Sequence, residues 1–190
     1  MTTASATKPE TQRLFFALWP DAGTAEHLAA LAEALATSGV KPGARPVPDA
    51  QMHMTLRFLG AVSTEQLPAL MAAAEQVAAE AEPFTVTLDK LGFWPQGGIL
   101  YAGCSKTPCR QRRLLDSLTA ALTEAGFKAD TGFYVPHVTL ARRVRGIDLP
   151  RLAPMRFEAT ELALVESQLH PSGARYRTLA TWPLAEPECD

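Results

Sequence analysis

The sequence predicts an α+β protein built as two pseudo-symmetric lobes that share one core. Strand-like and helix-like segments follow in the order strand, helix, strand, helix, strands, helix, strands, which suits this class. A tetrapeptide recurs in the two halves, as His53-Met54-Thr55-Leu56 and as His137-Val138-Thr139-Leu140. The chain has 190 residues, enough for one domain or two small lobes and too few for two independent domains.

We expect one bilobed domain over residues 13–185, between loose tails at residues 1–12 and 186–190. Hydrophobic residues make up 47% of the chain and charged residues 20%, a composition that argues against disorder. The net charge of −2 argues against a protein that coats long nucleic acids by bulk electrostatics. Any phosphate ligand would therefore have to be held locally.

The first half predicts two strands and two helices. Residues 13–19 form an apolar run that ends at Pro20-Asp21, as a buried strand followed by a helix start would. The helix that follows carries leucines at helical spacing until Ser38-Gly39. A link rich in proline and glycine leads to the strand of the first tetrapeptide. Residues 63–66, Ser-Thr-Glu-Gln, have the form of a capping box and predict a second helix that ends before Pro83.

The second half predicts one helix between groups of strands. Residues 84–91 alternate apolar and polar side chains, and we expect this strand to pair with one at residues 99–103. Thr107-Pro108 fits the N-cap and first position of a helix that stops at Gly126. The remaining strands are expected at the second tetrapeptide, at residues 157–169 and at residues 175–182.

Each tetrapeptide places a histidine and a threonine on one face of a strand, because side chains two positions apart point the same way. If the two strands lie side by side, two imidazoles and two hydroxyls surround one cleft. Such a group can carry out acid/base chemistry on a phosphate without a metal ion. A single histidine on a strand is usually structural, so it is the repetition that predicts catalysis.

The two motifs and their surroundings resemble the 2H phosphoesterase superfamily, and most of all its bacterial and archaeal 2′-5′ RNA ligase-like branch of RNA 2′,3′-cyclic phosphodiesterases. The matching segments are residues 13–17, 53–60, 134–142 and 166–169, with Gly173 and Tyr176. The resemblance covers nearly all of the chain, although the family usually has phenylalanine where this chain has Tyr134. It implies two lobes of antiparallel sheet with outer helices around a central, water-filled cleft that holds both motifs.

The resemblance also implies a reaction and the residues that perform it. A 2′,3′-cyclic phosphate at an RNA end would be opened by water to leave a 2′-phosphate. His53 would be the acid that protonates the leaving 3′-oxygen, and His137 the base that activates water. Thr55 and Thr139 would donate hydrogen bonds to the non-bridging phosphate oxygens. We expect no metal and no cofactor.

Three further residues are candidates for substrate contacts. Arg142 offers a guanidinium that can hold two phosphate oxygens, and the family often has arginine at this position. Strict alternation places Arg142 on the face opposite His137, so a strand end or a bulge must turn it inward. Arg57 either steers an RNA phosphate or is a solvated strand residue. Tyr134 is a candidate for stacking on a base in the cleft.

Other chemically versatile side chains receive structural interpretations. Trp94 and Phe16 are expected to pack in the core, His27 to lie on a helix surface and His170 in a loop. The remaining arginines expected to face solvent are Arg110, Arg112, Arg113, Arg143 and Arg145. The three cysteines lack the spacing of a disulfide framework or a zinc site, which fits a cytoplasmic protein.

Two other functions remain open at this stage. The same histidines could join a 2′,3′-cyclic end to a 5′-hydroxyl through a 2′-5′ bond, which is the reverse reaction with acid and base exchanged. Alternatively, the chain could be a nucleotide- or RNA-end-binding module without catalysis. The expected partner in all cases is an RNA or oligonucleotide end, bound by a monomer away from membranes.

Overall fold

The computed structural model describes residues 10–38, 43–128, 132–170 and 173–185. Most of the two expected tails lies outside the described residues. The first strand begins at Thr11, two residues earlier than expected, because residues 11 and 12 continue the ladder with the far end of the third strand.

The elements follow the order expected of an α+β chain. The strands are β1 (Thr11–Leu18), β2 (Arg45–Pro46), β3 (Met54–Ser63), β4 (Phe84–Leu88), β5 (Lys90–Trp94), β6 (Ile99–Gly103), β7 (His137–Arg142), β8 (Met155–Ala159), β9 (Glu161–His170) and β10 (Gly173–Pro183). The helices are α1 (Ala22–Ser38), α2 (Leu67–Glu80) and α3 (Cys109–Glu124), and short 3-10 turns lie at Asp49–Gln51 and Thr64–Gln66.

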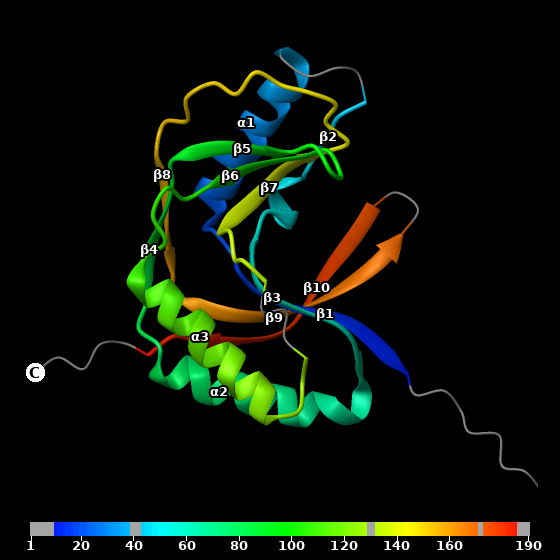
Figure 1. Cartoon of the computed structure of the whole chain (residues 1–190), viewed down its shortest axis with the longest axis vertical. Coiled ribbons are helices and arrows are strands. Elements are labelled where there is room, and N and C mark those ends of the chain that lie inside the picture. Colours follow the sequence, from blue (N-terminus) through cyan, green and yellow to red (C-terminus); the bar gives the residue numbers. More distant parts are fainter. Residues whose placement is uncertain (1–9, 39–42, 129–131, 171–172, 186–190) are drawn as a thin grey trace, which may run out of the picture.

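One antiparallel sheet runs through both lobes, in the order β10-β9-β1-β3-β7-β6-β5, with β2 paired to β7. Its two halves are joined by a single residue pair, Met54 of β3 opposite Val138 of β7. We call the half made of β10, β9, β1 and β3 the His53 lobe, and the half made of β7, β6, β5 and β2 the His137 lobe. Figure 1 shows the two lobes with their helices outside.

The helices cross between the lobes. α1 precedes β3 in the chain but packs against β7 and β2 of the other lobe. α3 precedes β7 but packs against α2 and β3, and α2 lies against β9 and β10. The helix that precedes each histidine strand in the sequence therefore packs on the opposite lobe. The pseudo-symmetric lobes are interlocked, not successive halves of the chain.

The helices form where the apolar stripes predict them. Leu28, Ala32 and Leu35 of α1 are buried, as are Leu114 and Leu118 of α3. Asp21 caps α1, since its carboxylate accepts hydrogen bonds from the Thr24 amide (2.9 Å) and hydroxyl (2.8 Å). These bonds lower the pKa of Asp21. The capping box at residues 63–66 is present, and it opens a 3-10 turn that leads into α2.

Three predictions about local structure are wrong. Residues 84–91 form two strands: β4 pairs with β8 in a separate small sheet, and β5 pairs with β6. Residues 157–169 also hold two strands, β8 and β9, because Thr160 breaks the run between them. α3 begins one residue later than expected, with Pro108 as its N-cap. Alternation along a strand identifies its faces but not the partner with which it pairs.

Candidate active site

The Met54–Val138 pair brings the two motifs together in a crossed arrangement. In an antiparallel ladder, residues on either side of a pair face each other in reverse order. His53 therefore lies across from Thr139, and His137 lies across from Thr55, on the face of the sheet opposite the buried Met54 and Val138. The two motifs are related by a local twofold axis through this pair. Each imidazole has the hydroxyl of the other motif as its cross-strand neighbour.

Both imidazoles are oriented in the same way. Nδ1 of His53 lies 2.7 Å from the carbonyl oxygen of Gln51, and Nδ1 of His137 lies 2.7 Å from the carbonyl oxygen of Val135. A carbonyl oxygen can only accept, so Nδ1 carries the hydrogen in each ring. Nε2 of each ring is therefore the nitrogen that is left to exchange a proton in the cleft.

Aromatic rings wall both histidines, and sequence reasoning missed most of them. The His53 ring lies 5.0 Å from Phe15, 5.3 Å from Trp19 and 4.8 Å from Tyr176, measured between ring centroids. The strict alternation of β1 contains a signal for Phe15, because it must face away from the fully buried Phe16, whose place in the core is confirmed. These rings remove water from one side of the imidazole.

The prediction that Trp94 packs in the core is wrong. Trp94 meets the His137 ring edge-on at 4.7 Å, and Tyr101 lies 5.5 Å from the same ring. Trp94 ends β5, an element the sequence interpretation merged with β4, so its facing direction could not be inferred. Both histidines thus lie against aromatic rings, which come from different parts of the chain.

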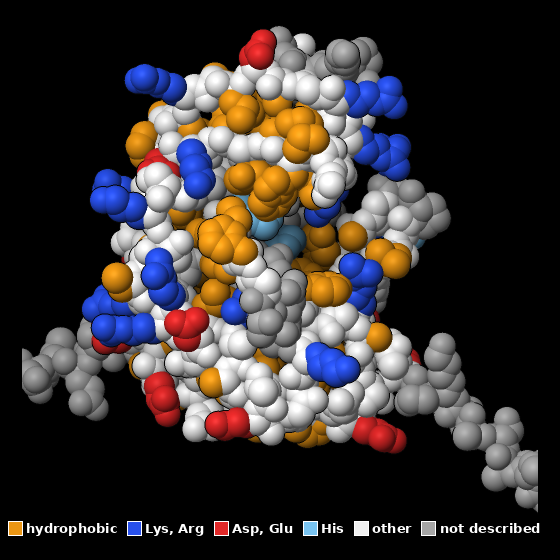
Figure 2. Space-filling model, in the orientation of Figure 1, with side chains coloured by type: hydrophobic (Ala, Val, Ile, Leu, Met, Phe, Trp, Pro, Cys, Tyr) orange, Lys and Arg blue, Asp and Glu red, His pale blue; other side chains and the backbone are white. Residues whose placement is uncertain are grey.

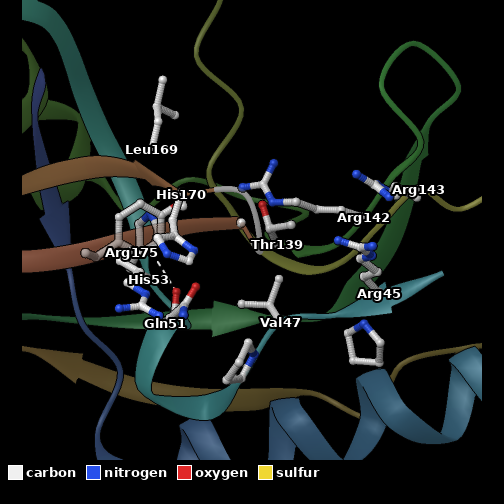
Figure 3. A pocket seen from close by; sticks show the side chains of 15 residues that line it. Arg45, Val47, Gln51, His53, Thr139, Arg142, Arg143, Leu169, His170 and Arg175 are labelled. Carbon is white, nitrogen blue, oxygen red and sulfur yellow. Dashed lines mark hydrogen bonds between the residues drawn. The ribbon is translucent and has the colours of Figure 1, made fainter. Parts of the chain in front are cut away.

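The cleft consists of two hollows, and each is lined by the histidine of one motif and the threonine of the other. The larger, about 490 Å³, is lined by His53, Thr139 and Arg142 among others. The smaller, about 210 Å³, is lined by His137 and Thr55. Figure 2 shows histidine side chains at the bottom of a hollow with apolar and cationic side chains around it, and Figure 3 shows the larger hollow from close by. A ligand in the cleft would contact both motifs.

Arg142 reaches the same hollow as His53 because β7 contains the bulge that its inward direction requires. Leu100 of β6 pairs with Ala141, but the next residue, Tyr101, pairs with Thr139, so Leu140 is the extra residue. Leu140 and Ala141 are consecutive and both fully buried. The bulge resets the alternation and returns Arg142 to the side of Thr139.

Arg57 and Tyr134 line the smaller hollow, and each is anchored to α3. Nε of Arg57 donates a 2.8 Å hydrogen bond to Oγ1 of Thr119. The Tyr134 hydroxyl accepts a 3.0 Å hydrogen bond from Nε2 of Gln111, and burial raises the pKa of Tyr134, which keeps it neutral. Arg57 is therefore not a freely solvated strand residue. Its guanidinium contacts α3 as well as lining the smaller hollow.

Gln111 is a buried residue that the sequence analysis did not single out. It is fully buried, and its Nε2 also lies 3.0 Å from Sδ of Met54, the residue that joins the two lobes. Its Oε1 has no hydrogen-bond partner among the described residues. A glutamine among the leucines of an amphipathic stripe was the available signal, since buried polar groups are normally kept for a specific contact.

Burial lowers the pKa of His53 from 6.5 to about 4, because the protonated ring loses hydration. The hydrogen bond to Gln51 opposes this change, while the positive charges of Arg142 and His137 add to it. The pKa of His137 is also lowered, by burial first and by Arg142 after it. These shifts favour the neutral form of both rings at neutral pH, and a bound phosphate anion would favour their protonated forms.

The other predicted placements have mixed outcomes. His27 is exposed on α1, as expected. His170, expected in a loop, is the last residue of β9 and lines the larger hollow, so this prediction is wrong. Arg143 is exposed but also lines this hollow, together with Arg45 and Arg175.

Two cysteines lie within the described residues as free thiols. Cys104 is buried and Cys109 is exposed, and burial raises the pKa of Cys104 to about 11. Cys189 lies outside the described residues. The described residues contain no group of three or more His, Cys, Asp or Glu arranged to hold a metal ion. In the same part of the chain, no helix has the length and apolarity to cross a membrane.

The sequence and the fold are both similar to those of known phosphoesterases. Residues 18–101 match the LigT-like phosphoesterase family. An RNA 2′,3′-cyclic phosphodiesterase of Thermus thermophilus is 35% identical over 187 residues, covering 90% of this chain and 90% of the relative. The RNA 2′,3′-cyclic phosphodiesterase of Escherichia coli is 31% identical, covering 93% of this chain and 99% of that one. The chain belongs to the LigT-like phosphoesterase family.

Solved structures of LigT phosphoesterases have the same fold. E. coli LigT complexed with 3′-AMP superposes with a TM-score of 0.78 at 29% identity, covering 92% of this chain and 99% of that one. TT0787 of T. thermophilus gives a TM-score of 0.76 at 28% identity and covers 92% of this chain and 98% of its own. The predicted membership of the 2H phosphoesterases and the predicted fold class are confirmed.

Proposed function

We propose that this LigT-like phosphoesterase hydrolyses RNA 2′,3′-cyclic phosphate ends to 2′-phosphate ends by two-histidine acid/base catalysis that needs no metal. The observation that supports this most is the Met54–Val138 register, which sets two identically oriented imidazoles and two hydroxyls around one cleft. The names of the curated relatives, RNA 2′,3′-cyclic phosphodiesterases, support the substrate and the cleavage of a cyclic phosphate.

The reaction would proceed in line through the two Nε2 atoms. Nε2 of His137 takes a proton from water as the water oxygen forms a bond to phosphorus. The bond between phosphorus and O3′ breaks, and Nε2–H of His53 protonates the departing O3′. The product carries a 2′-phosphate and a 3′-hydroxyl. His53 ends neutral and His137 protonated, so both exchange a proton with solvent before the next cycle.

The remaining motif residues would act on the phosphate itself. The hydroxyls of Thr55 and Thr139 donate to the two non-bridging oxygens, on which negative charge builds in the transition state. The guanidinium of Arg142 holds the same phosphate with a fixed positive charge. Tyr134 and the 97% exposed Phe133, both in the wall of the smaller hollow, offer faces on which a base can stack.

The low pKa of His53 is compatible with its role as the acid. The cyclic phosphate brings a negative charge next to an imidazole that burial and Arg142 hold neutral. This charge raises the pKa of His53 on binding, so the ring takes up a proton together with the substrate. His53 therefore becomes the protonated acid only when the substrate is bound.

Ligation of the cyclic end to a 5′-hydroxyl is a second candidate, and the matching orientation of the two histidines favours it. Each ring has the same Nδ1 partner type and a cross-strand threonine. A 5′-hydroxyl in place of water would attack the cyclic phosphate and leave a 2′-5′ linkage, with His137 as the base and His53 as the acid, so the exchange of roles expected from the sequence is not needed. Water is present at far higher concentration in an open cleft, so hydrolysis dominates. A monomeric state and a cytoplasmic location stay predictions.

Turnover of a short RNA ending in a 2′,3′-cyclic phosphate tests the proposal. His53→Ala and His137→Ala should each lower kcat by at least about 100-fold with the fold intact, as judged by circular dichroism. His27→Ala, which removes an exposed imidazole from α1, is the matched control and should keep wild-type turnover. Retained activity in both cleft variants would refute the mechanism, and tight binding without turnover by the wild type would indicate a binding module.

A further inference from the structure

The larger hollow contains more positive charge than one phosphate needs. Its walls carry four arginines, namely Arg45, Arg142, Arg143 and Arg175. None of the described residues lining it has a carboxylate, and none of the four arginines forms an ion pair with a described residue. The chain as a whole has a net charge of −2, so this concentration of guanidinium groups is local.

Two consecutive arginines reach this hollow because the backbone departs twice from regular strand geometry. The bulge at Leu140 turns Arg142 inward. Arg143 then adopts a φ of 60°, and it is the single non-glycine residue with positive φ in the described part of the chain. Neighbouring strand residues normally point to opposite faces. Left-handed backbone at Arg143 allows its side chain to line the same hollow as Arg142.

The neighbouring loop holds this costly conformation in place. The amide of Val144 donates a 2.9 Å hydrogen bond to the carbonyl oxygen of Gly98. A Cβ atom at Gly98 would lie 2.6 Å from the carbonyl oxygen of Val144, so a glycine is needed for this close approach. Backbone strain that the surrounding structure maintains is characteristic of functional sites. The strain at Arg143 therefore points to a use for its side chain.

We propose that Arg45 and Arg143 form a subsite for a second phosphate, the internucleotide phosphodiester adjacent to the cyclic end. This inference rests on the proposed function and names its substrate class: an oligonucleotide, in preference to a mononucleoside cyclic phosphate. Arg142 lies between the two subsites. It lines the hollow together with Thr139, and its cross-strand partner in the ladder is Arg45.

The layout of the hollow fits a strand that extends away from the reacting phosphate. In Figure 3, Arg142 reaches over Thr139, while Arg45 and Arg143 lie at the end of the hollow away from His53. Paired residues on antiparallel strands have Cα atoms about 5 Å apart, so Arg45 and Arg142 can contact neighbouring phosphates of one strand. Guanidinium groups bind phosphate oxygens in pairs, which suits a diester.

Three substrates distinguish the contribution of the second phosphate to binding from that of the first. They are adenosine 2′,3′-cyclic phosphate, the dinucleotide that carries the same cyclic end, and that dinucleotide with a neutral methylphosphonate linkage. For the wild type, kcat/KM should be at least about tenfold higher for the charged dinucleotide than for the other two. The advantage should shrink as salt rises, because the arginines are exposed.

Variants then assign the preference to residues. Arg45→Gln and Arg143→Gln should bring the ratio of kcat/KM between charged and neutral dinucleotides toward one. Arg143→Gly should do so while raising the melting temperature, because glycine accepts positive φ without strain. Arg145→Gln, a neighbouring exposed arginine that does not line the hollow, is the control and should keep the wild-type ratio.

The outcomes also separate this inference from the proposed function. Equal kcat/KM values on all three substrates in the wild type would overturn the subsite and leave the hydrolysis in place. A wild-type ratio retained by both Arg45→Gln and Arg143→Gln would do the same. Failure to hydrolyse any of the three would overturn the proposed function, and the subsite with it.

Discussion

Replacing Arg142 by glutamine removes the arginine of the larger hollow whose charge acts on both His53 and His137. A hydrogen bond to a charged group contributes about 1.5–3 kcal/mol, and each 1.4 kcal/mol corresponds to a factor of ten. We therefore expect Arg142→Gln to lower kcat/KM for a cyclic-ended RNA by about 10- to 150-fold. The strand should persist, because the Arg142 side chain is exposed.

The same substitution should move the pH dependence in a defined direction. The positive charge of Arg142 lowers the pKa of both His53 and His137. Its removal raises both pKa values in the free enzyme, so the bell-shaped profile of kcat/KM should shift to higher pH. Arg142→Lys keeps a charge but not the planar fork, so this variant should lose rate with little shift of the profile.

The assay is the initial rate of ring opening between about pH 4.5 and 8.5 at constant ionic strength, for the wild type, Arg142→Gln and Arg142→Lys. Arg145→Gln serves as the control for a lost surface charge. A shift of the Arg142→Gln profile to lower pH, or a loss of kcat/KM below about threefold, would refute the position and role given to this guanidinium.

Three other predictions follow from the site. Thr139→Val keeps the β-branched shape but removes the hydroxyl, so it should lower kcat by about 100-fold with little change in melting temperature. An unchanged kcat would show that the Thr139 hydroxyl does not stabilise the transition state. His53 has a folded-state pKa of about 4 against 6.5, so the unfolded state binds more protons between these values, and the protein should lose up to about 3 kcal/mol of stability from this group as the pH falls from 6.5 to 4. Denaturant titrations should show a smaller acid loss in His53→Gln, and an equal loss would contradict the low pKa. Gly92→Ala places a Cβ atom against the Tyr101 ring and should displace this ring from His137. The variant should have a lower kcat and a shifted His137 pKa, measured by NMR. Unchanged spectra would show that Tyr101 does not lie against His137.

The sequence could predict the chemistry of the site because this chemistry depends on local alternation. A histidine and a threonine two residues apart must share a strand face, and the repeat implies that two such faces meet. That a strand end or a bulge must turn Arg142 inward could also be anticipated, but the choice between the two and the position at Leu140 came from the structure. The three helices were predictable for the same reason, because their buried stripes are periodic.

What the sequence could not predict depends on pairing between distant segments. Alternation gave no indication that β4 pairs with β8 or that α1 covers the lobe of β7. Trp94 was assigned to the core because the strand that ends at it was not recognised, although it lies against His137. Arg143 looked like an ordinary surface charge, because nothing in its neighbours reveals a positive φ that depends on Gly98 across a loop.

The central claim is that His53 delivers its proton to O3′ and that water activated by His137 becomes part of the product. The most direct test is to resolve the products of a cyclic-ended RNA incubated with the wild-type protein in EDTA. A 2′-phosphate with a free 3′-hydroxyl, formed at an undiminished rate without metal, is the predicted result. A 3′-phosphate product, or activity that returns only when a divalent metal is added, would contradict the account.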